Sequence, residues 1–318
     1  MRVSAFLQYY FKGATIEMPI PIIIDTDPGI DDAAAISFAL HHPEIDVKLI
    51  NTVHGNVSID KTTRNALTLV EYFNKDVPVS RGQAVPLIQP PIYAEHVHGE
   101  TGMDGFEFPP LTRTVKSDNG VEAMRSIIVE SHFPITLVPI GPLTNIALLL
   151  KHHPEIKHQI KEIVLMGGSA SRGNVTVAAE FNIYADPEAA QIVFDSGVPI
   201  TVIGLDVVRT TNLPLEKLPQ IQNTNQTGAM LVELFRHYRG ENFQQGLNVY
   251  DAYTIMYLIN PDLFTLRPAH VDVELKGEHT QGMTIMDFQH SQPNAQIVMQ
   301  IQYEDFLDCF FSLLSYCP

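Results

Sequence analysis

The chain has 318 residues, of which 45% are hydrophobic, so it is long enough to bury a large core within one domain. Its 36 acidic and 20 basic residues give a formal charge of −16, which disfavours binding to nucleic acid, to anionic membranes and to strongly anionic substrates. The sequence has no apolar run of the length that spans a bilayer. Its two cysteines, Cys309 and Cys317, form no disulfide framework and fit a reducing cytoplasm.

Residues 1–17 precede the first expected strand, and we expect them to be an extension outside the fold. Their short apolar runs are interrupted by Gln8 and Lys12, and no A-x-A-like cleavage site follows, so a secretory signal is not expected. Met18 stands directly before the first strand. We therefore predict a single domain over residues 18–318.

The first expected elements are a buried strand and a helix joined by a turn. β-Branched residues run up to Asp25, and Pro28 with Gly29 prevents the strand from continuing. A helix is predicted over residues 31–40, because that segment is apolar on nearly every side, as in a helix packed on a central sheet. Four carboxylates then lie at the carboxyl end of a strand, where open α/β sheets bind ligands: Asp25, Asp27, Asp31 and Asp32.

The rest of the chain alternates between β-rich runs and helical patterns, which predicts an α/β fold with a mostly parallel central sheet flanked by helices. Strands are expected over residues 47–53, 135–140, 163–166 and 200–205. Helices are expected over residues 61–72, 143–150, 187–194, 230–238 and 252–259. Residues 82–111 are predicted to be a long loop, which inside a compact domain is usually functional. Residues 213–248 are a candidate mobile lid.

The acidic cluster favours a bound cation. Two carboxylates about 4 Å apart repel by roughly 4 kcal/mol at an effective dielectric near 20, and a hard divalent cation removes that cost. An all-oxygen site favours calcium or magnesium over zinc. The competing interpretation is that Asp31 or Asp32 caps the helix and that Asp25 binds backbone amides, and we expect it to hold for one of the four. The spacing does not fit an EF-hand loop, because Gly29 and Ile36 occupy ligand positions.

Other polar side chains are expected at the same edge of the sheet, where they follow predicted strands or open predicted helices. They are Asn56, Asn174, Glu180, Asn182 and Asp251. Each alone is a weak indication, since Asn and Asp are common turn and cap residues. Their shared position at the carboxyl ends of the strands is the stronger one.

Taken together, these segments resemble the inosine-uridine preferring nucleoside hydrolases. The resemblance covers nearly all of residues 18–314. It rests on DTDPGIDDA (25–33), VHGN (53–56), VHGETG (97–102), IGPLTN (140–145) and MGG (166–168) with AEFN (179–182). The first motif is highly specific, and a chance match to all five is implausible. Within the family, the chain is most similar to the bacterial ribonucleoside hydrolases that accept both purine and pyrimidine nucleosides.

The resemblance implies calcium-dependent hydrolysis of the N-glycosidic bond of ribonucleosides, as used in purine and pyrimidine salvage, by a homodimer or homotetramer. It implies that Ca²⁺ is held by Asp27, Asp32, Asp251 and the carbonyl of Ile140, with Asp25 supporting these ligands. It also implies that the substrate is bound by Asp31, Asn56, Asn174, Glu180 and Asn182, with His98 and Met166 beside them. Asp27 is our choice for the general base, since a carboxylate beside the attacking water can take its proton. Few basic residues occur in the motifs, so nucleotides should be poor substrates.

The chain departs from many members of the family at Tyr250, where they have a histidine that is thought to protonate the leaving purine. A phenol, with a reference pKa of about 10, is a weaker acid than imidazolium. Tyr250 is therefore a candidate proton donor, a residue that stacks on the base, or a packing residue. On the preceding helix, His237, Tyr238 and Arg239 are further candidates to reach the base.

Three further features are open to two interpretations. His54 is expected to pack at its strand end, whereas His98 is as much a candidate to face the substrate as to pack. The turn that begins at Met166 could bind an anion through its backbone amides, but we favour a tight turn that brings Asn174 and Glu180 to the ribose.

Two other functions compete with ribonucleoside hydrolysis. A haloacid-dehalogenase-like phosphatase would use Asp25 as its nucleophile and magnesium as its cofactor, but the residues after Pro28 do not follow that pattern. A nucleoside-binding protein without catalysis is suggested by Tyr250. It ranks below the hydrolase because the carboxylates expected to activate water are all present.

Overall fold

The computed structural model describes residues 8–11, 14–239 and 246–318. A nine-stranded sheet forms the centre, in the order β10-β9-β11-β8-β7-β6-β3-β4-β5. Six neighbouring strands are parallel: β3 (Ile20–Thr26), β4 (Ile45–Thr52), β5 (Val79–Arg81), β6 (Ile135–Pro139), β7 (Ile160–Met166) and β8 (Ile200–Ile203). β11 (Ala295–Ile301) pairs parallel to β8, and β9 (Phe264–Val273) and β10 (Thr284–Asp287) extend the sheet antiparallel. The predicted α/β fold with a mostly parallel sheet is confirmed.

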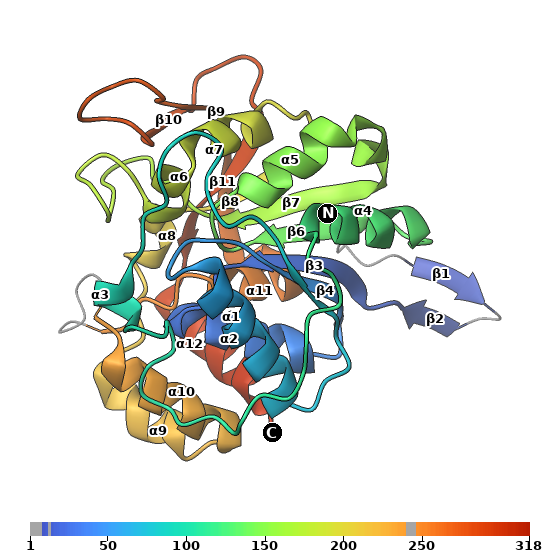
Figure 1. Ribbon diagram of the computed structural model, residues 1–318, viewed down its shortest axis with the longest axis vertical. Helices are drawn as coiled ribbons and strands as arrows, with labels where there is room; N and C mark the ends of the chain where they lie inside the picture. The colour runs from blue at the N-terminus through green and yellow to red at the C-terminus, as the bar shows by residue number, and fades with distance from the viewer. Residues whose placement is uncertain (1–7, 12–13, 240–245) are drawn as a thin grey trace.

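Both faces of the sheet are covered by helices, because the central strands are apolar on both sides. In β3, Ile22 and Ile24 join one hydrophobic cluster and Ile23 joins the other, as the two-residue period of a strand requires. Figure 1 shows the sheet between two layers of helices. One layer contains α1 (Ile30–His41), α10 (Gln226–His237), α11 (Ala252–Ile259) and α12 (Tyr303–Ser315); the other contains α4 (Gly120–Glu130), α5 (Thr144–His152) and α7 (Pro187–Phe194).

The remaining helices are α2 (Ile59–Tyr72), α8 (Leu205–Val208) and several short segments. α2 packs along β4 and β5, and α8 lies against β11. The short elements are α3 (Glu95–His98), α6 (Phe181–Ala185), α9 (Leu218–Gln222), η1 (Pro154–Gln159), η2 (Leu215–Lys217) and η4 (Pro261–Leu263). No helix among the described residues is long and apolar enough to cross a membrane.

Every strand and helix predicted from the sequence is present, with ends that differ by a few residues. The predicted loop over residues 82–111 contains α3 as its regular element within the described chain. Of the candidate lid, residues 213–239 and 246–248 carry η2, α9 and α10, whereas Gly240 and the five residues after it lie outside the described residues. Its mobility stays a prediction.

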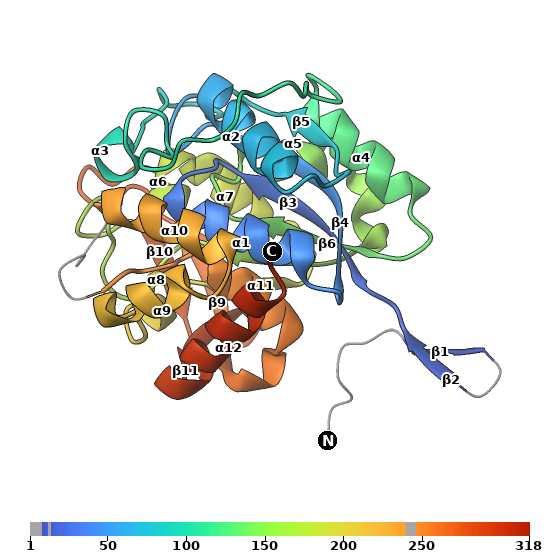
Figure 2. The ribbon, with the colours of Figure 1, turned by 90° about the horizontal axis from the view of Figure 1, so that it is seen from below.

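The N-terminal residues form a separate element. β1 (Gln8–Phe11) and β2 (Ala14–Glu17) pair antiparallel as a sheet of two strands, so neither adds to the central sheet. Figure 2 shows this hairpin apart from the layers of helices. That residues 18–318 form one domain without this extension stays a prediction.

Candidate active site

The predicted site residues meet at the carboxyl edge of the sheet. Asp27 follows β3, Asn56 lies in the turn after β4, Ile140 follows β6, and Met166 ends β7. Because these four strands are parallel neighbours, their carboxyl ends lie side by side. The topology therefore brings together residues that are far apart in the sequence.

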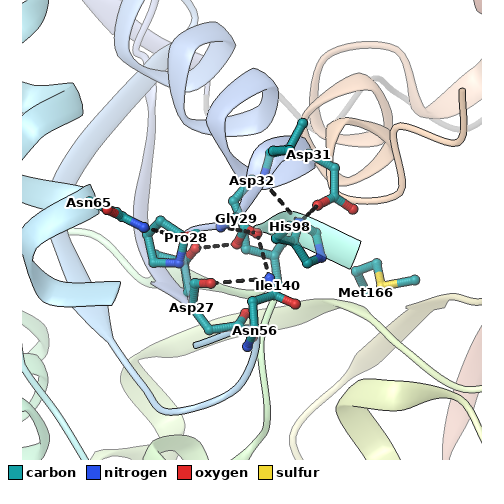
Figure 3. A network of polar contacts seen from close by, with 12 residues as sticks. Asp27, Pro28, Gly29, Asp31, Asp32, Asn56, Asn65, His98, Ile140 and Met166 are labelled. Carbon is teal, nitrogen blue, oxygen red and sulfur yellow. Dashed lines mark hydrogen bonds and ion pairs between the residues drawn. The ribbon is translucent and has the colours of Figure 1, made fainter. Parts of the chain in front are cut away.

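Asn56, in the turn after β4, is hydrogen-bonded to the acidic residues of the β3–α1 connection (Figure 3). Its backbone N–H donates to Oδ2 of Asp27 at 2.6 Å. Its side-chain amide donates to the carbonyl of Asp27 and to Oδ2 of Asp32, each at 3.1 Å. Asp32 also accepts from the hydroxyl of Thr26 at 2.6 Å and from the backbone N–H of Gly29 at 2.8 Å. Asp32 therefore partly caps the start of α1. The simpler interpretation of the acidic cluster predicts such a cap for one of its four carboxylates.

Asp25 lies below this layer and is fully buried. Its Oδ1 accepts from the side-chain amides of Asn51 and Asn145, at 2.7 and 2.8 Å, whereas its Oδ2 has no hydrogen-bond partner among the described residues. Burial raises the pKa of Asp25 to about 7, although the two amides lower it. Asp25 is thus positioned by side-chain amides, not by the backbone amides that the simpler interpretation expected.

Three buried carboxylates could share one cation. Asp31, Asp32 and Asp251 each offer an oxygen, and these oxygens lie within 4.8 Å of one another. Burial raises the pKa of all three, and for Asp31 and Asp251 the neighbouring carboxylates raise it further. Asp31 thus lies together with the expected ligands Asp32 and Asp251, although the resemblance assigns Asp31 to the ribose.

Asp27, the remaining expected carboxylate ligand, lies outside this group of three but has an oxygen that is unpartnered among the described residues. Its Oδ1 is buried and has no hydrogen-bond partner in the described part of the chain, and burial together with Asp32 and Asp31 raises its pKa well above the usual range. Such an orphaned oxygen in an all-oxygen cluster fits a hard divalent cation. Close packing fixes the carboxylate, since a Cβ on Gly55 would lie 2.0 Å from its Oδ2 and one on Gly141 2.5 Å from its Oδ1.

The opposite side of the site is built by Glu180 and Asn182 at the start of α6. Glu180 accepts from the backbone N–H groups of Asn182 and Gly168, both at 2.9 Å, and of Ile183 at 3.2 Å. The side-chain amide of Asn182 donates to the carbonyls of Ile140 and Met166, both at 3.1 Å. The turn after Met166 therefore gives the Gly168 N–H to a carboxylate of the chain itself, as the tight-turn interpretation expects.

A cavity opens above these residues. Its lining includes ten of the predicted site residues: Asp31, Asn56, His98, Ile140, Met166, Asn174, Glu180, Asn182, Tyr250 and Asp251. Ala94, His96, Val97, Val175, Phe181 and Tyr238 complete it. Asp25, Asp27 and Asp32 are almost wholly buried and are not part of this lining, so they form the layer beneath it.

His98 and Tyr238 form one wall of the cavity. Nδ1 of His98 accepts the backbone N–H of Ile30 at 3.1 Å, so the ring is neutral with its proton on Nε2. Burial lowers the pKa of His98 to about 3. Its Nδ1 lies 3.8 Å from Oδ1 of Asp31, but the two side chains form no ion pair because the ring is neutral. The ring packs edge-on against Tyr238, with centroids 5.5 Å apart.

The other candidates for the base are placed differently. Tyr250 is buried beside Asp251, and its phenol accepts from the side-chain amide of Asn248 at 3.1 Å. His237 is exposed, its Nδ1 lies 3.1 Å from the carbonyl of Glu233, and it does not line the cavity. The structure thus does not bring His237 to the site. His54 is buried at the end of β4 against the hydroxyl of Thr144, at 3.1 Å, as packing requires.

Comparisons with known proteins agree with this site. Residues 22–308 match the family described as inosine-uridine preferring nucleoside hydrolase. The chain belongs to this family, and it has the fold of an enzyme that cleaves nucleosides with water. The predicted resemblance is confirmed, and the phosphatase alternative is not supported.

Individual relatives are similar over most of their length. Non-specific ribonucleoside hydrolase RihC of Escherichia coli is 48% identical over 91% of this chain and 96% of its own, and RihC of Klebsiella pneumoniae is 49% identical over the same shares. Among solved structures, the purine-preferring ribonucleoside hydrolase of Gardnerella vaginalis has a TM-score of 0.86 and 31% identity, covering 93% of this chain and 98% of its own.

Proposed function

We propose that the protein hydrolyses the N-glycosidic bond of ribonucleosides, both purine and pyrimidine, with calcium as its metal. The observation that carries this proposal is the cavity floor, where the carboxylates of Asp31, Glu180 and Asp251 stand beside the amides of Asn56 and Asn182. A ribose offers hydroxyl groups, and carboxylates and amides are the side chains that bind them. The names of the RihC relatives support a broad range of bases.

We assign the calcium to Asp27, Asp32, Asp251 and the carbonyl of Ile140, with Asp31 within reach of the same ion. The support is the unpartnered Oδ1 of Asp27 together with the grouped oxygens of the other carboxylates. Bound there, calcium would supply the positive charge that keeps these carboxylates ionised and that acidifies a nearby water. Asp25, which is held by Asn51 and Asn145, keeps the supporting role that the resemblance implies.

Asp27 is the proposed general base. Its Oδ2 is held by the N–H of Asn56, whereas its Oδ1 is available to take a proton. The attacking water gives that proton to Asp27 and adds its oxygen to C1′ of the ribose. The remaining floor residues position the sugar for this attack: Asp31, Asn56, Asn174, Glu180 and Asn182. Because Glu180 is fixed by three backbone N–H groups, it holds its place without the substrate.

The base would occupy the part of the cavity beyond the ribose, next to His98, Met166 and Tyr250. Tyr250, a candidate to protonate the base, to stack on it or to pack beneath it, lines this part of the cavity together with Asp251. We further propose that the enzyme works in the cytoplasm as a homodimer or homotetramer, as the resemblance implies.

The decisive test is release of reducing sugar from inosine and from uridine by the purified chain, with calcium and with a chelator. We expect release from both nucleosides with calcium, loss of release with the chelator, and little release from inosine 5′-monophosphate. Asp27→Asn should abolish release, whereas Asp46→Asn, at a half-exposed ion pair with Lys48, should not. Inosine binding without any ribose release would favour the binding-protein alternative.

A further inference from the structure

His96, on helix α3, lines the wall of the cavity but has no role in the proposed mechanism. α3 is fixed to the end of α10, since the backbone N–H of Arg239 donates to the carbonyl of Val97 at 3.0 Å and the ring of His98 packs on Tyr238. Both His96 and His98 line the cavity. His98 is buried, whereas His96 is exposed to solvent.

The part of the cavity near α3 is where the base must lie. The ribose is assigned to the carboxylates and amides of the floor, which leaves a largely apolar and aromatic lining for the base. Besides His98, Met166 and Tyr250, that lining contains Ala94, His96, Val97, Val175, Phe181 and Tyr238. His96 is the exposed imidazole of this set, and an imidazole is a common proton donor in catalysis.

The other candidate acids are unsuited to the task. The Nδ1 lone pair of His98 is taken by the N–H of Ile30, and burial holds the pKa of this imidazole at about 3, so its charged form is scarce at neutral pH. Tyr250 is a buried phenol, with a reference pKa of about 10. Because this phenol is buried, solvent reaches it less readily than an exposed imidazole to return a proton after each turnover.

In contrast to the buried His98 and Tyr250, His96 is exposed to solvent. Within the described part of the chain, no group hydrogen-bonds to its ring, and solvent can return a proton to it after each turnover. The nearest acidic neighbour in sequence, Glu95, is already paired with Nζ of Lys61 at 2.8 Å. The neighbouring imidazole of His98 is neutral, so it places no charge beside the ring of His96.

We infer that His96 is a further catalytic residue, the acid that protonates the departing base. This inference rests on the proposed ribonucleoside hydrolysis. As the bond between C1′ and the base nitrogen breaks, its electron pair passes to the base, and the imidazolium of His96 gives its proton to a ring nitrogen of the purine. Water supplies the hydroxyl to C1′ and its other proton to Asp27. Asp27 then loses that proton to solvent, and His96 regains one from solvent.

The test compares two substrates with the same ribose. Inosine needs protonation of its leaving base, whereas 4-nitrophenyl β-D-riboside releases a stable nitrophenolate without it. We expect His96→Gln to lower kcat on inosine by about 10²-fold and to leave kcat on the nitrophenyl riboside unchanged. His158→Gln removes an exposed histidine of η1, at the amino end of β7, and should change neither rate. Added imidazole should restore part of the inosine turnover of His96→Ala.

Several results would overturn the inference. An equal loss on both substrates in His96→Gln would mean that His96 only maintains the cavity wall, and no loss on either would mean that it is not used. A selective loss of inosine turnover in Tyr250→Phe, with His96→Gln unaffected, would assign the proton to the phenol. By contrast, a wild-type protein that releases ribose from neither substrate would reject the proposed function itself.

Discussion

The backbone N–H of Asn56 donates to the Asp27 carboxylate at 2.6 Å, and the side chain of Asn56 donates to the Asp27 carbonyl at 3.1 Å. Two neighbouring strand ends, of β3 and β4, are thus joined through a residue that also lines the cavity. Since the same amide reaches Asp32, Asn56 orients two proposed calcium ligands as well as the substrate. Its loss should therefore affect catalysis more than folding.

Asn56→Ala tests this coupling. The change removes both side-chain hydrogen bonds while the backbone bond to Asp27 remains. A hydrogen bond to a charged group contributes roughly 1.5–3 kcal/mol, so kcat/KM for inosine should fall about ten- to hundredfold. Asn119→Ala removes the cap of α4, where the side chain accepts from the N–H of Glu122. That control should lose about 1 kcal/mol of stability and keep its kcat/KM. Unchanged kcat/KM in Asn56→Ala would contradict the assignment.

Removal of calcium should destabilise the folded protein. Without a cation, burial and mutual repulsion raise the pKa of Asp27, Asp31 and Asp251, so the empty cluster disfavours the folded state near neutral pH. Calcium at 100 times its Kd should add about 2.7 kcal/mol to the free energy of unfolding. Thermal unfolding with chelator and with calcium measures this increase. In Asp251→Asn, calcium should no longer raise the free energy of unfolding. An identical Tm in both buffers would argue against a folded-state calcium site.

The metal-free protein should lose stability as the pH rises from about 4 to 7. The pKa of Asp25 is about 7 in the folded state against 3.8 as the ordinary value, so the folded state holds the extra proton in this window and the unfolded state does not. At 1.36 kcal/mol per pKa unit, the loss approaches roughly 4 kcal/mol above pH 7. The raised pKa of Glu180 acts in the same direction.

Asp25→Asn isolates this contribution. The variant keeps the oxygen that accepts from Asn51 and Asn145, and it places an uncharged amide where Oδ2 has no partner among the described residues. Urea unfolding in chelator should show that the free energy of unfolding falls less between pH 5 and pH 8 for the variant than for the wild type. Asp46→Asn, half-exposed beside Lys48, should follow the wild-type curve. Parallel curves for all three proteins would exclude Asp25 as the titrating group.

Five adjacent strands of the sheet, β3, β4, β6, β7 and β8, and most of the cavity could be predicted from the sequence because their signals are local. The apolar run that ends at Asp25, the break at Pro28 and Gly29, and the alternating helical patterns define strand ends without reference to the rest of the chain. In a parallel sheet the carboxyl ends of the strands share one edge, so the sequence alone predicts that Asp27, Asn56 and Ile140 lie together.

The C-terminal strands and the base end of the cavity could not be predicted in this way. β9 carries Arg267, Pro268 and His270 within ten residues, so its alternation of buried and exposed positions is irregular. On α10, His237 and Tyr238 are neighbours, yet the helix ends between them and only Tyr238 turns to the cavity. Which of two adjacent residues faces the cavity depends on the residue at which the helix ends. The periodic pattern of hydrophobic residues does not fix that residue. His96 was missed because a short helix inside a long loop has no periodic pattern.

Gly141→Ala should impair catalysis by moving a single carboxylate. The added Cβ would lie 2.5 Å from Oδ1 of Asp27, closer than such contacts occur, and 3.0 Å from a methyl group of Val53, which is also tight, so the carboxylate must shift. A displacement of about 1 Å in a catalytic group can cost roughly 10²-fold in rate. Gly197→Ala is the matched control: its φ of +78° makes alanine costly by about 1 kcal/mol, but nothing lies within 4 Å of its Cβ. We expect the control to be less stable with normal kcat, and Gly141→Ala to lose kcat on inosine and calcium affinity together. If Gly141→Ala kept both, Asp27 Oδ1 would be neither a calcium ligand nor the general base, and another carboxylate of the floor would have to take the proton.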